Sequence, residues 1–131
     1  MSHRLDVKIY YEDTDCGGVV YYANYLRYME RARTEYLESR GFGVKALITD
    51  EGTIFMVLRV EIDYRSPARY GDTILVETRV RDVTRATMIF EHVMRDKGTG
   101  RVFVECMAKM VIVDPHGKPK RLPVEYAERL K

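Results

Sequence analysis

The sequence contains no tryptophan, only two cysteines and no long apolar run. None of its segments approaches the roughly 18 consecutive apolar residues that a membrane-spanning helix requires. Residues 1–6 lack the apolar stretch of a secretory signal peptide, so we expect a cytoplasmic protein. One disulfide between Cys16 and Cys106 is possible in a chain of this size, but in that compartment we expect both thiols to be reduced.

An excess of charge of either sign is also lacking. The 22 lysines and arginines nearly balance the 20 acidic residues and give a formal charge of +2. The basic residues are scattered along the chain, which argues against a nucleic-acid-binding surface. The 131 residues, 46% of them hydrophobic, suit one globular domain with a sizeable core. Since no linker or repeat is visible, we predict a single domain over residues 1–131.

Hydrophobic periodicity predicts one strand followed by one long helix. Residues 5–10 alternate between apolar and polar, as in a strand with one buried face. Within residues 22–40, the side chains at 25, 29, 32 and 36 form an apolar stripe along a helix. Gly41 then provides a natural helix terminator. Short helices are expected at residues 43–51 and 123–130, the second opened by a proline.

Four further strands are predicted after the long helix. Turns rich in glycine, proline or polar residues separate them, and short connections favour antiparallel pairing. Successive antiparallel strands packed on one helix form an α+β architecture, and strongly twisted sheets curl. The pattern therefore predicts a five-stranded antiparallel sheet wrapped around one long central helix. The four strands are expected at residues 53–65, 72–83, 87–95 and 101–114.

An unusual segment at residues 10–25 connects the first strand to the long helix. It places two aspartates, Asp13 and Asp15, and then two glycines just before the predicted helix. The N-terminus of a helix has unpaired N–H groups and carries about half a positive charge. A carboxylate facing such donors is a plausible small active site, and we predict one here.

Three simpler interpretations of this segment were considered. Aspartates before a helix commonly act as turn or capping residues, and for Asp13 we favour a side chain that accepts backbone N–H groups of the loop. A calcium loop starting at Asp13 would need a bidentate glutamate at its twelfth position, where this chain has Asn24. A nucleophilic Cys16 would need a histidine partner, and no histidine lies near it in the sequence. The second and third interpretations are therefore disfavoured.

The same segment resembles the signature of hotdog-fold acyl-CoA thioesterases. The resemblance is carried by the sequence Tyr-Glu-Asp-Thr-Asp at 11–15, Gly-Val-Val-Tyr at 18–21, Asn-Tyr at 24–25 and Glu-Arg-Ala-Arg-Thr-Glu at 30–35. It is strongest to the 4-hydroxybenzoyl-CoA thioesterase family and its small bacterial subgroup associated with the Tol-Pal gene cluster. It continues through residues 64–68, Asp72 and residues 113–114, and so spans nearly the whole chain.

The resemblance implies roles for several residues. Asp15 corresponds to the catalytic carboxylate, and Tyr22 to the position whose backbone N–H polarises the thioester carbonyl. Many members of the subgroup have histidine where this chain has Tyr22, whereas the 4-hydroxybenzoyl-CoA enzyme has tyrosine, so the substrate preference is left open. Gly18 and Val19 of the motif are expected to contact substrate. The chemistry implied needs neither a metal nor a cofactor.

The resemblance also implies partners. The substrate is an acyl-CoA with a short-chain or aromatic acyl group, and Arg85 and Lys118 lie where the family places cations for the coenzyme A phosphates. Hotdog proteins pair through sheet edges into dimers, often doubled to tetramers, so we expect a homo-oligomer with its active site between subunits. The alternative is a non-catalytic hotdog module that binds acyl-CoA or acyl-carrier protein, or scaffolds an envelope complex.

Asp15 can contribute to hydrolysis in two ways, and the sequence leaves both open. The carboxylate either attacks the carbonyl to form a mixed anhydride or activates water as a general base. Elsewhere in the chain, Arg33 shares the apolar stripe of the long helix, so we expect it to pair with a glutamate at a subunit interface. His92 alternates within a strand and is expected to be structural, while His3 and His116 are expected at the surface.

Overall fold

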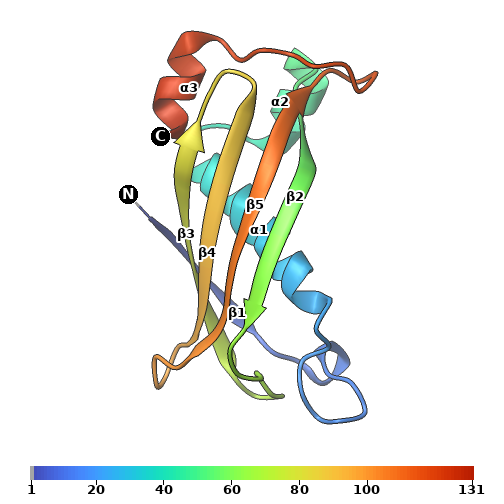
Figure 1. Ribbon diagram of the computed structural model, residues 1–131, viewed down its shortest axis with the longest axis vertical. Coiled ribbons are helices and arrows are strands. Elements are labelled where there is room, and N and C mark those ends of the chain that lie inside the picture. The colour runs from blue at the N-terminus through green and yellow to red at the C-terminus, as the bar shows by residue number, and fades with distance from the viewer. Residues whose placement is uncertain (1) are drawn as a thin grey trace.

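The computed structural model describes residues 2–131, which form a five-stranded antiparallel sheet and three α-helices (Figure 1). The strand order is β1-β3-β4-β5-β2, so β1 and β2 are the two edge strands. The predicted α+β class and five-stranded antiparallel sheet are confirmed. The strands are β1 (His3–Lys8), β2 (Ile54–Tyr64), β3 (Thr73–Val83), β4 (Thr87–Asp96) and β5 (Val102–Val113).

Alternation along the strands gives the sheet one buried face. In β4, Met88, Phe90, His92 and Met94 are buried, while the residues that alternate with them are only half-buried. Phe90 lies opposite Ala108 of β5 in the register, and Ala108 is also fully buried. Because side chains of directly opposed residues share a face, the apolar sets of neighbouring strands form one continuous surface.

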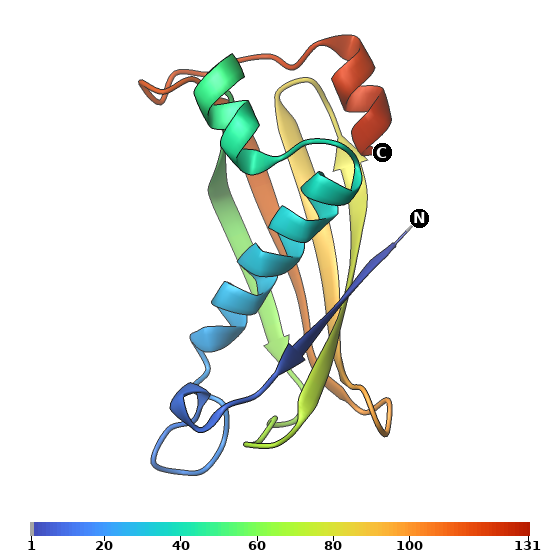
Figure 2. The same cartoon turned by 180° about the vertical axis from the view of Figure 1, so that it is seen from behind.

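The long helix α1 (Asn24–Ser39) covers this buried face, as Figure 2 shows. The predicted stripe is confirmed, because Tyr25, Met29, Ala32 and Tyr36 are all at most 3% exposed. Tyr36 packs edge-on against Phe90, with ring centroids 5.6 Å apart. Most of the stability of such a helix comes from burial of its apolar stripe on the sheet, and less comes from helix propensity.

Two shorter helices close one end of the sheet. They are α2 (Val44–Glu51) and α3 (Val124–Leu130), close to the predicted ranges. The Tyr36 hydroxyl donates a hydrogen bond of 3.0 Å to the carbonyl of Leu130, which ties the C-terminal helix to α1. Within residues 2–131, none of the helices is long and apolar enough to cross a bilayer.

The predicted and observed elements differ most around the N-terminal loop. β1 ends at Lys8 rather than residue 10, because residues Tyr11–Asp13 form a turn of 3-10 helix. α1 begins at Asn24 rather than residue 22, because the Asn24 N–H bonds to the carbonyl of Tyr21 in a preceding turn. His3 is half-buried within β1, so the expectation of a surface histidine there is wrong, whereas His116 is exposed as predicted.

Candidate active site

The acidic segment forms a compact loop beside the first turn of α1 (Figure 2). The Asp15 N–H donates to the Val19 carbonyl at 2.9 Å, and the Gly18 N–H donates to the Asp15 carbonyl at 3.1 Å. Gly18 has a φ of +80°, a conformation that residues with a Cβ rarely adopt. The predicted substrate-binding residues Gly18 and Val19 therefore lie in the same tight turn as Asp15.

Asp15 is an exposed residue of this loop. Its side chain is exposed, and Oδ1 accepts a hydrogen bond of 2.8 Å from the Gly17 N–H. It does not cap α1, whose N-cap residue is Ala23. Among the described residues, no donor reaches the other oxygen, Oδ2, and Asp15 does not line any of the five principal cavities. One chain therefore presents the carboxylate without enclosing it.

Asp13 holds the loop in place. Its Oδ2 accepts a hydrogen bond of 2.8 Å from the Tyr10 N–H, so the structural role predicted for Asp13 is confirmed. Its backbone carbonyl accepts two further hydrogen bonds, 2.9 Å from the Tyr21 N–H and 2.8 Å from Asn24 Nδ2. Burial and the nearby Asp13 carboxylate raise the pKa of Tyr28. The role of Asn24 was not predicted, because a contact between residues 11 positions apart has no sequence signal.

Tyr22 lies in the turn that precedes α1. Its backbone N–H donates no hydrogen bond within residues 2–131. Its carbonyl accepts a bond of 3.3 Å from the hydroxyl of Tyr64, the last residue of β2, and the two rings meet edge-on. The loop thus carries both an exposed carboxylate and an unused backbone donor. The donor stands two residues before the first helical residue instead of within the helix.

A second segment supports the loop from the sheet side. Val19 forms an antiparallel bridge with Arg69, and the Val20 N–H donates to the Ala68 carbonyl at 2.8 Å. The Ile9 N–H donates to the carbonyl of Asp72, directly before β3. The loop is therefore attached to the end of the sheet at which β3 begins.

The two predicted phosphate-binding cations follow the C-terminal ends of β3 and β5, which lie at the opposite end of the sheet (Figure 1). Arg85 follows β3, and its Nε donates a hydrogen bond of 2.7 Å to the Leu122 carbonyl. Lys118 is exposed in the turn after β5, where its N–H donates to Asp114 Oδ1 at 3.0 Å. At about 3.3 Å per residue, β3 alone separates the two ends by roughly 36 Å. One chain therefore does not bring Arg85 or Lys118 to Asp15.

A buried polar cluster lies between the middle of α1 and the sheet. His92 is fully buried, and its Nδ1 shares a hydrogen bond of 2.8 Å with the Thr78 hydroxyl. Burial, assisted by the Arg33 charge, lowers the pKa of His92 to about 3. Burial raises the pKa of the Cys106 thiol to about 12, and both Cys16 and Cys106 are free thiols. The cluster agrees with a structural His92 and with two reduced cysteines.

Arg33 belongs to this cluster but has no partner in it. Arg33 is 9% exposed, and its guanidinium makes no hydrogen bond or ion pair with any other residue of the described chain. Burial lowers the pKa of Arg33, and the nearby Glu30 opposes that shift. The pairing that we predicted with a glutamate is therefore not formed within one chain.

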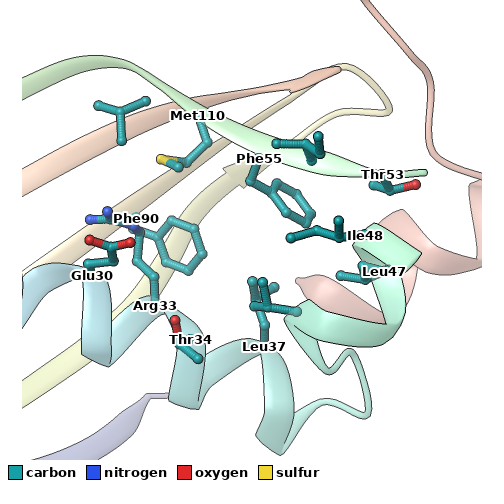
Figure 3. A pocket seen from close by; sticks show the side chains of 13 residues that line it. Glu30, Arg33, Thr34, Leu37, Leu47, Ile48, Thr53, Phe55, Phe90 and Met110 are labelled. Carbon is teal, nitrogen blue, oxygen red and sulfur yellow. The ribbon is translucent and has the colours of Figure 1, made fainter. Parts of the chain in front are cut away.

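Arg33 also lines a cavity that sequence reasoning missed (Figure 3). The cavity has a volume of about 290 Å³ and lies between α1, α2 and the first residues of β2. Its members come from five separate helices and strands, so no local pattern could predict it. Its lining residues are Glu30, Arg33, Thr34, Leu37, Val44, Leu47, Ile48, Thr53, Ile54, Phe55, Val57, Phe90 and Met110.

Known proteins match this chain over most of its length. The family model described as the thioesterase-like superfamily matches residues 10–130. The chain is 41% identical to the acyl-CoA thioesterase YbgC of Haemophilus influenzae, over 91% of this chain and 87% of that protein. It is 35% identical to the acyl-CoA thioester hydrolase YbgC of Escherichia coli, over 98% of this chain and 95% of that protein.

A solved structure matches the same fold at lower identity. It is a 1,4-dihydroxy-2-naphthoyl-CoA thioesterase from Synechocystis, with a TM-score of 0.89 and 20% sequence identity. The match covers 99% of this chain and 96% of that chain. The likeness therefore extends to the whole sheet and all three helices.

Proposed function

The chain belongs to the thioesterase-like superfamily, and we propose that it hydrolyses acyl-CoA with Asp15 as the reacting carboxylate. Relatives that are 35% and 41% identical over most of the chain are named acyl-CoA thioester hydrolases, and the fold is the hotdog fold expected from the sequence. The family makes this chain an acyl-CoA thioester hydrolase. The residues that perform the reaction are our inference.

One observation carries this proposal: Asp15 and the Tyr22 N–H lie on the same loop, which hydrogen bonds hold in place. Asp13 and Asn24 fix that loop through three hydrogen bonds of 2.8–2.9 Å. A catalytic site needs its groups held within about 0.5 Å of the productive geometry, and these three hydrogen bonds favour such precision. The exposed carboxylate and the unused donor are the two groups that thioester hydrolysis requires.

The reaction follows from these groups. The Tyr22 N–H donates to the thioester oxygen as negative charge develops, an interaction worth about 3–4 kcal/mol in comparable sites. Asp15 either attacks the carbonyl carbon, expelling the coenzyme A thiolate and leaving an anhydride that water opens, or removes a proton from the attacking water. Both routes consume one water and release a free acid and a thiol.

We further propose that two chains pair through β2. This edge strand exposes Met56, Val57 and Leu58, and the Leu58 side chain is 60% exposed. An uncovered apolar edge is rarely left free, and a second copy of the same strand can cover it about a two-fold axis. The exposed side of α1 supports the same arrangement, because Arg27 and Arg31 lie in its first half and Glu35 and Glu38 in its second.

Antiparallel β2 pairing would place a cavity and two cations opposite the Asp15 loop, which a single chain does not do. Tyr64, at the C-terminal end of β2, touches Tyr22 of the loop, whereas the cavity lies at the N-terminal end of the same strand. Antiparallel pairing sets opposite ends side by side, so the loop of one chain would face the cavity of the other. Lys118 and Arg85 lie at the cavity end as well and would reach the phosphates of a substrate bound by the partner's loop. A tetramer would then be a pair of these dimers.

Asp15→Asn tests the catalytic assignment. Release of free thiol is measured across a panel of acyl-CoAs, with Cys16→Ser as the control in the neighbouring residue. We expect Asp15→Asn to lose about 100- to 10,000-fold in kcat, the usual contribution of such a group, and Cys16→Ser to retain wild-type turnover. Equal rates for Asp15→Asn and wild type would remove Asp15 from the mechanism. Binding of acyl-CoA without turnover by the wild type would instead identify a non-catalytic module, including one that serves acyl-carrier protein.

A further inference from the structure

Arg33 is a buried cation whose guanidinium makes no hydrogen bond or ion pair with another residue of 2–131. It has five N–H donors and carries its charge at any physiological pH. Burying such a cation without a partner is costly, so buried charges in native proteins are normally paired. Arg33 is 9% exposed and has no partner within the described chain, but it lines the cavity of about 290 Å³. A group that enters the cavity can therefore supply the missing acceptor.

The cavity is lined mainly by apolar side chains, and its two charged residues, Glu30 and Arg33, are neighbours (Figure 3). Glu30 and Arg33 lie together on one side, while Leu47 and Ile48 lie on the other. Leu37 and Leu47 are buried, whereas Glu30 and Ile48 are exposed and mark the mouth. An apolar cavity with a few convergent polar groups is the usual form of a small-molecule site.

The position of Arg33 favours a small ligand over a protein side chain from another subunit. Arg33 lies on the buried face of α1 with Ala32 and Tyr36, not on the exposed face with Arg27 and Arg31. Its electrostatic neighbours include His92 and Cys106, both on the core side of the sheet. A partner's glutamate would have to pass between helix and sheet to reach it, whereas an acyl group can enter through the cavity mouth.

We propose that this cavity binds the acyl group and that Arg33 donates hydrogen bonds to an oxygen on its distal part. The proposal rests on the hydrolase function and on the β2 pairing described above, which brings the cavity to the partner's Asp15. It deepens that function by naming a substrate class, acyl chains that end in a hydroxyl or a carboxylate. Arg33 is then the residue that determines specificity within this class.

The chemistry of the cavity suits both oxygen groups. A carboxylate can accept two parallel N–H bonds from a guanidinium. A hydroxyl can accept from Arg33 and donate to Glu30, which lines the same side. A plain alkyl chain of the same length fills the apolar side but leaves the cation unpaired. Plain acyl chains should therefore bind less tightly than oxygenated ones of equal length.

The test compares three acyl-CoAs of equal carbon number: hexanoyl, omega-hydroxyhexanoyl and adipoyl. The wild type should favour at least one oxygenated ester over hexanoyl-CoA by about 10- to 100-fold in kcat/KM, the usual worth of a hydrogen bond to a charged group. Arg33→Leu should lower kcat/KM for the favoured oxygenated ester to the value for hexanoyl-CoA, and the variant should fold, since an apolar replacement of a buried charge commonly preserves folding. Arg33→Lys, which keeps a donor, should restore part of the preference. The favoured ester identifies the oxygen group.

Three results would overturn the proposal. The first is a wild type without preference, and the second is an Arg33→Leu protein that loses turnover of all three esters equally. The third is dissociation of the Arg33→Leu protein into smaller species in sedimentation velocity, which would assign Arg33 to a subunit contact. Calorimetric binding of the same esters to Asp15→Asn measures the preference without catalysis. If Asp15→Asn still turns over while Arg33→Leu loses the preference, the catalytic assignment fails and the binding site stands.

Discussion

His92 should make the stability of the fold dependent on pH below neutrality. The side chain is fully buried between α1 and the sheet, faces the Arg33 charge and bonds to the Thr78 hydroxyl. Its pKa falls to about 3 in the folded chain from an ordinary value of 6.5. Unfolding therefore frees an imidazole that binds a proton throughout the range between these two values.

The sign and size of the effect follow from that difference. Because the folded pKa is the lower one, the unfolded chain binds more protons, and stability falls as the pH drops below 6.5. At 1.36 kcal/mol per pH unit, lowering the pH from 7 to 5 costs about 2 kcal/mol, with a limit of about 5 kcal/mol at pH 3. This loss is a large fraction of the typical 5–15 kcal/mol stability of a small domain.

Urea unfolding of wild type and His92→Asn at a series of pH values measures this effect. Asparagine keeps a polar partner for Thr78 but does not titrate. Between pH 7 and pH 5, the free energy of unfolding of His92→Asn should therefore fall by about 2 kcal/mol less than that of the wild type. Parallel curves of unfolding free energy against pH would show that His92 binds its proton as readily in the folded chain as in the unfolded chain. The structural role that we assign to it would then be wrong.

Three further substitutions test separate contacts. Asn24→Ala removes the side-chain donor to the Asp13 carbonyl, so kcat should fall about tenfold or more with little change in KM. The free energy of unfolding, measured by thermal unfolding, should fall by only about 1 kcal/mol. Lys118→Ala should raise KM for acyl-CoA several-fold, increasingly so at low salt, without lowering kcat; an unchanged KM would exclude a phosphate contact. Tyr36→Phe leaves the Leu130 carbonyl unpaired and should cost about 1–3 kcal/mol in urea unfolding, with turnover retained.

Local pattern was enough to predict the elements of the fold. The stripe through Tyr25, Met29, Ala32 and Tyr36 fixes which face of α1 is buried, and alternation within the strands does the same for the sheet. The boundaries were less accurate around residues 9–23, where hydrogen bonds between neighbours convert the predicted strand end and helix start into turns.

The candidate site was only partly predictable for a different reason. The motif indicated Asp15 and Tyr22, but the Asn24 clamp and the cavity around Arg33 depend on contacts between distant residues. Arg85 and Lys118 were expected in a site shared between subunits, and in one chain they follow the ends of β3 and β5, at the end of the sheet opposite the Asp15 loop. The family resemblance implied a site between subunits, but the pattern of the residues alone does not specify how they are divided between two chains.

Subunit mixing tests that division most directly. Asp15→Asn removes the carboxylate, and Ile48→Trp fills the mouth of the cavity, so each variant alone should be inactive. When the two are unfolded and refolded together, half of the dimers are mixed, and each mixed dimer has one site with an intact Asp15 facing an intact cavity. Thiol release should then recover to about a quarter of the wild-type rate. If the mixture stays as inactive as its components, the carboxylate and the cavity act within a single chain and the composite site is refuted.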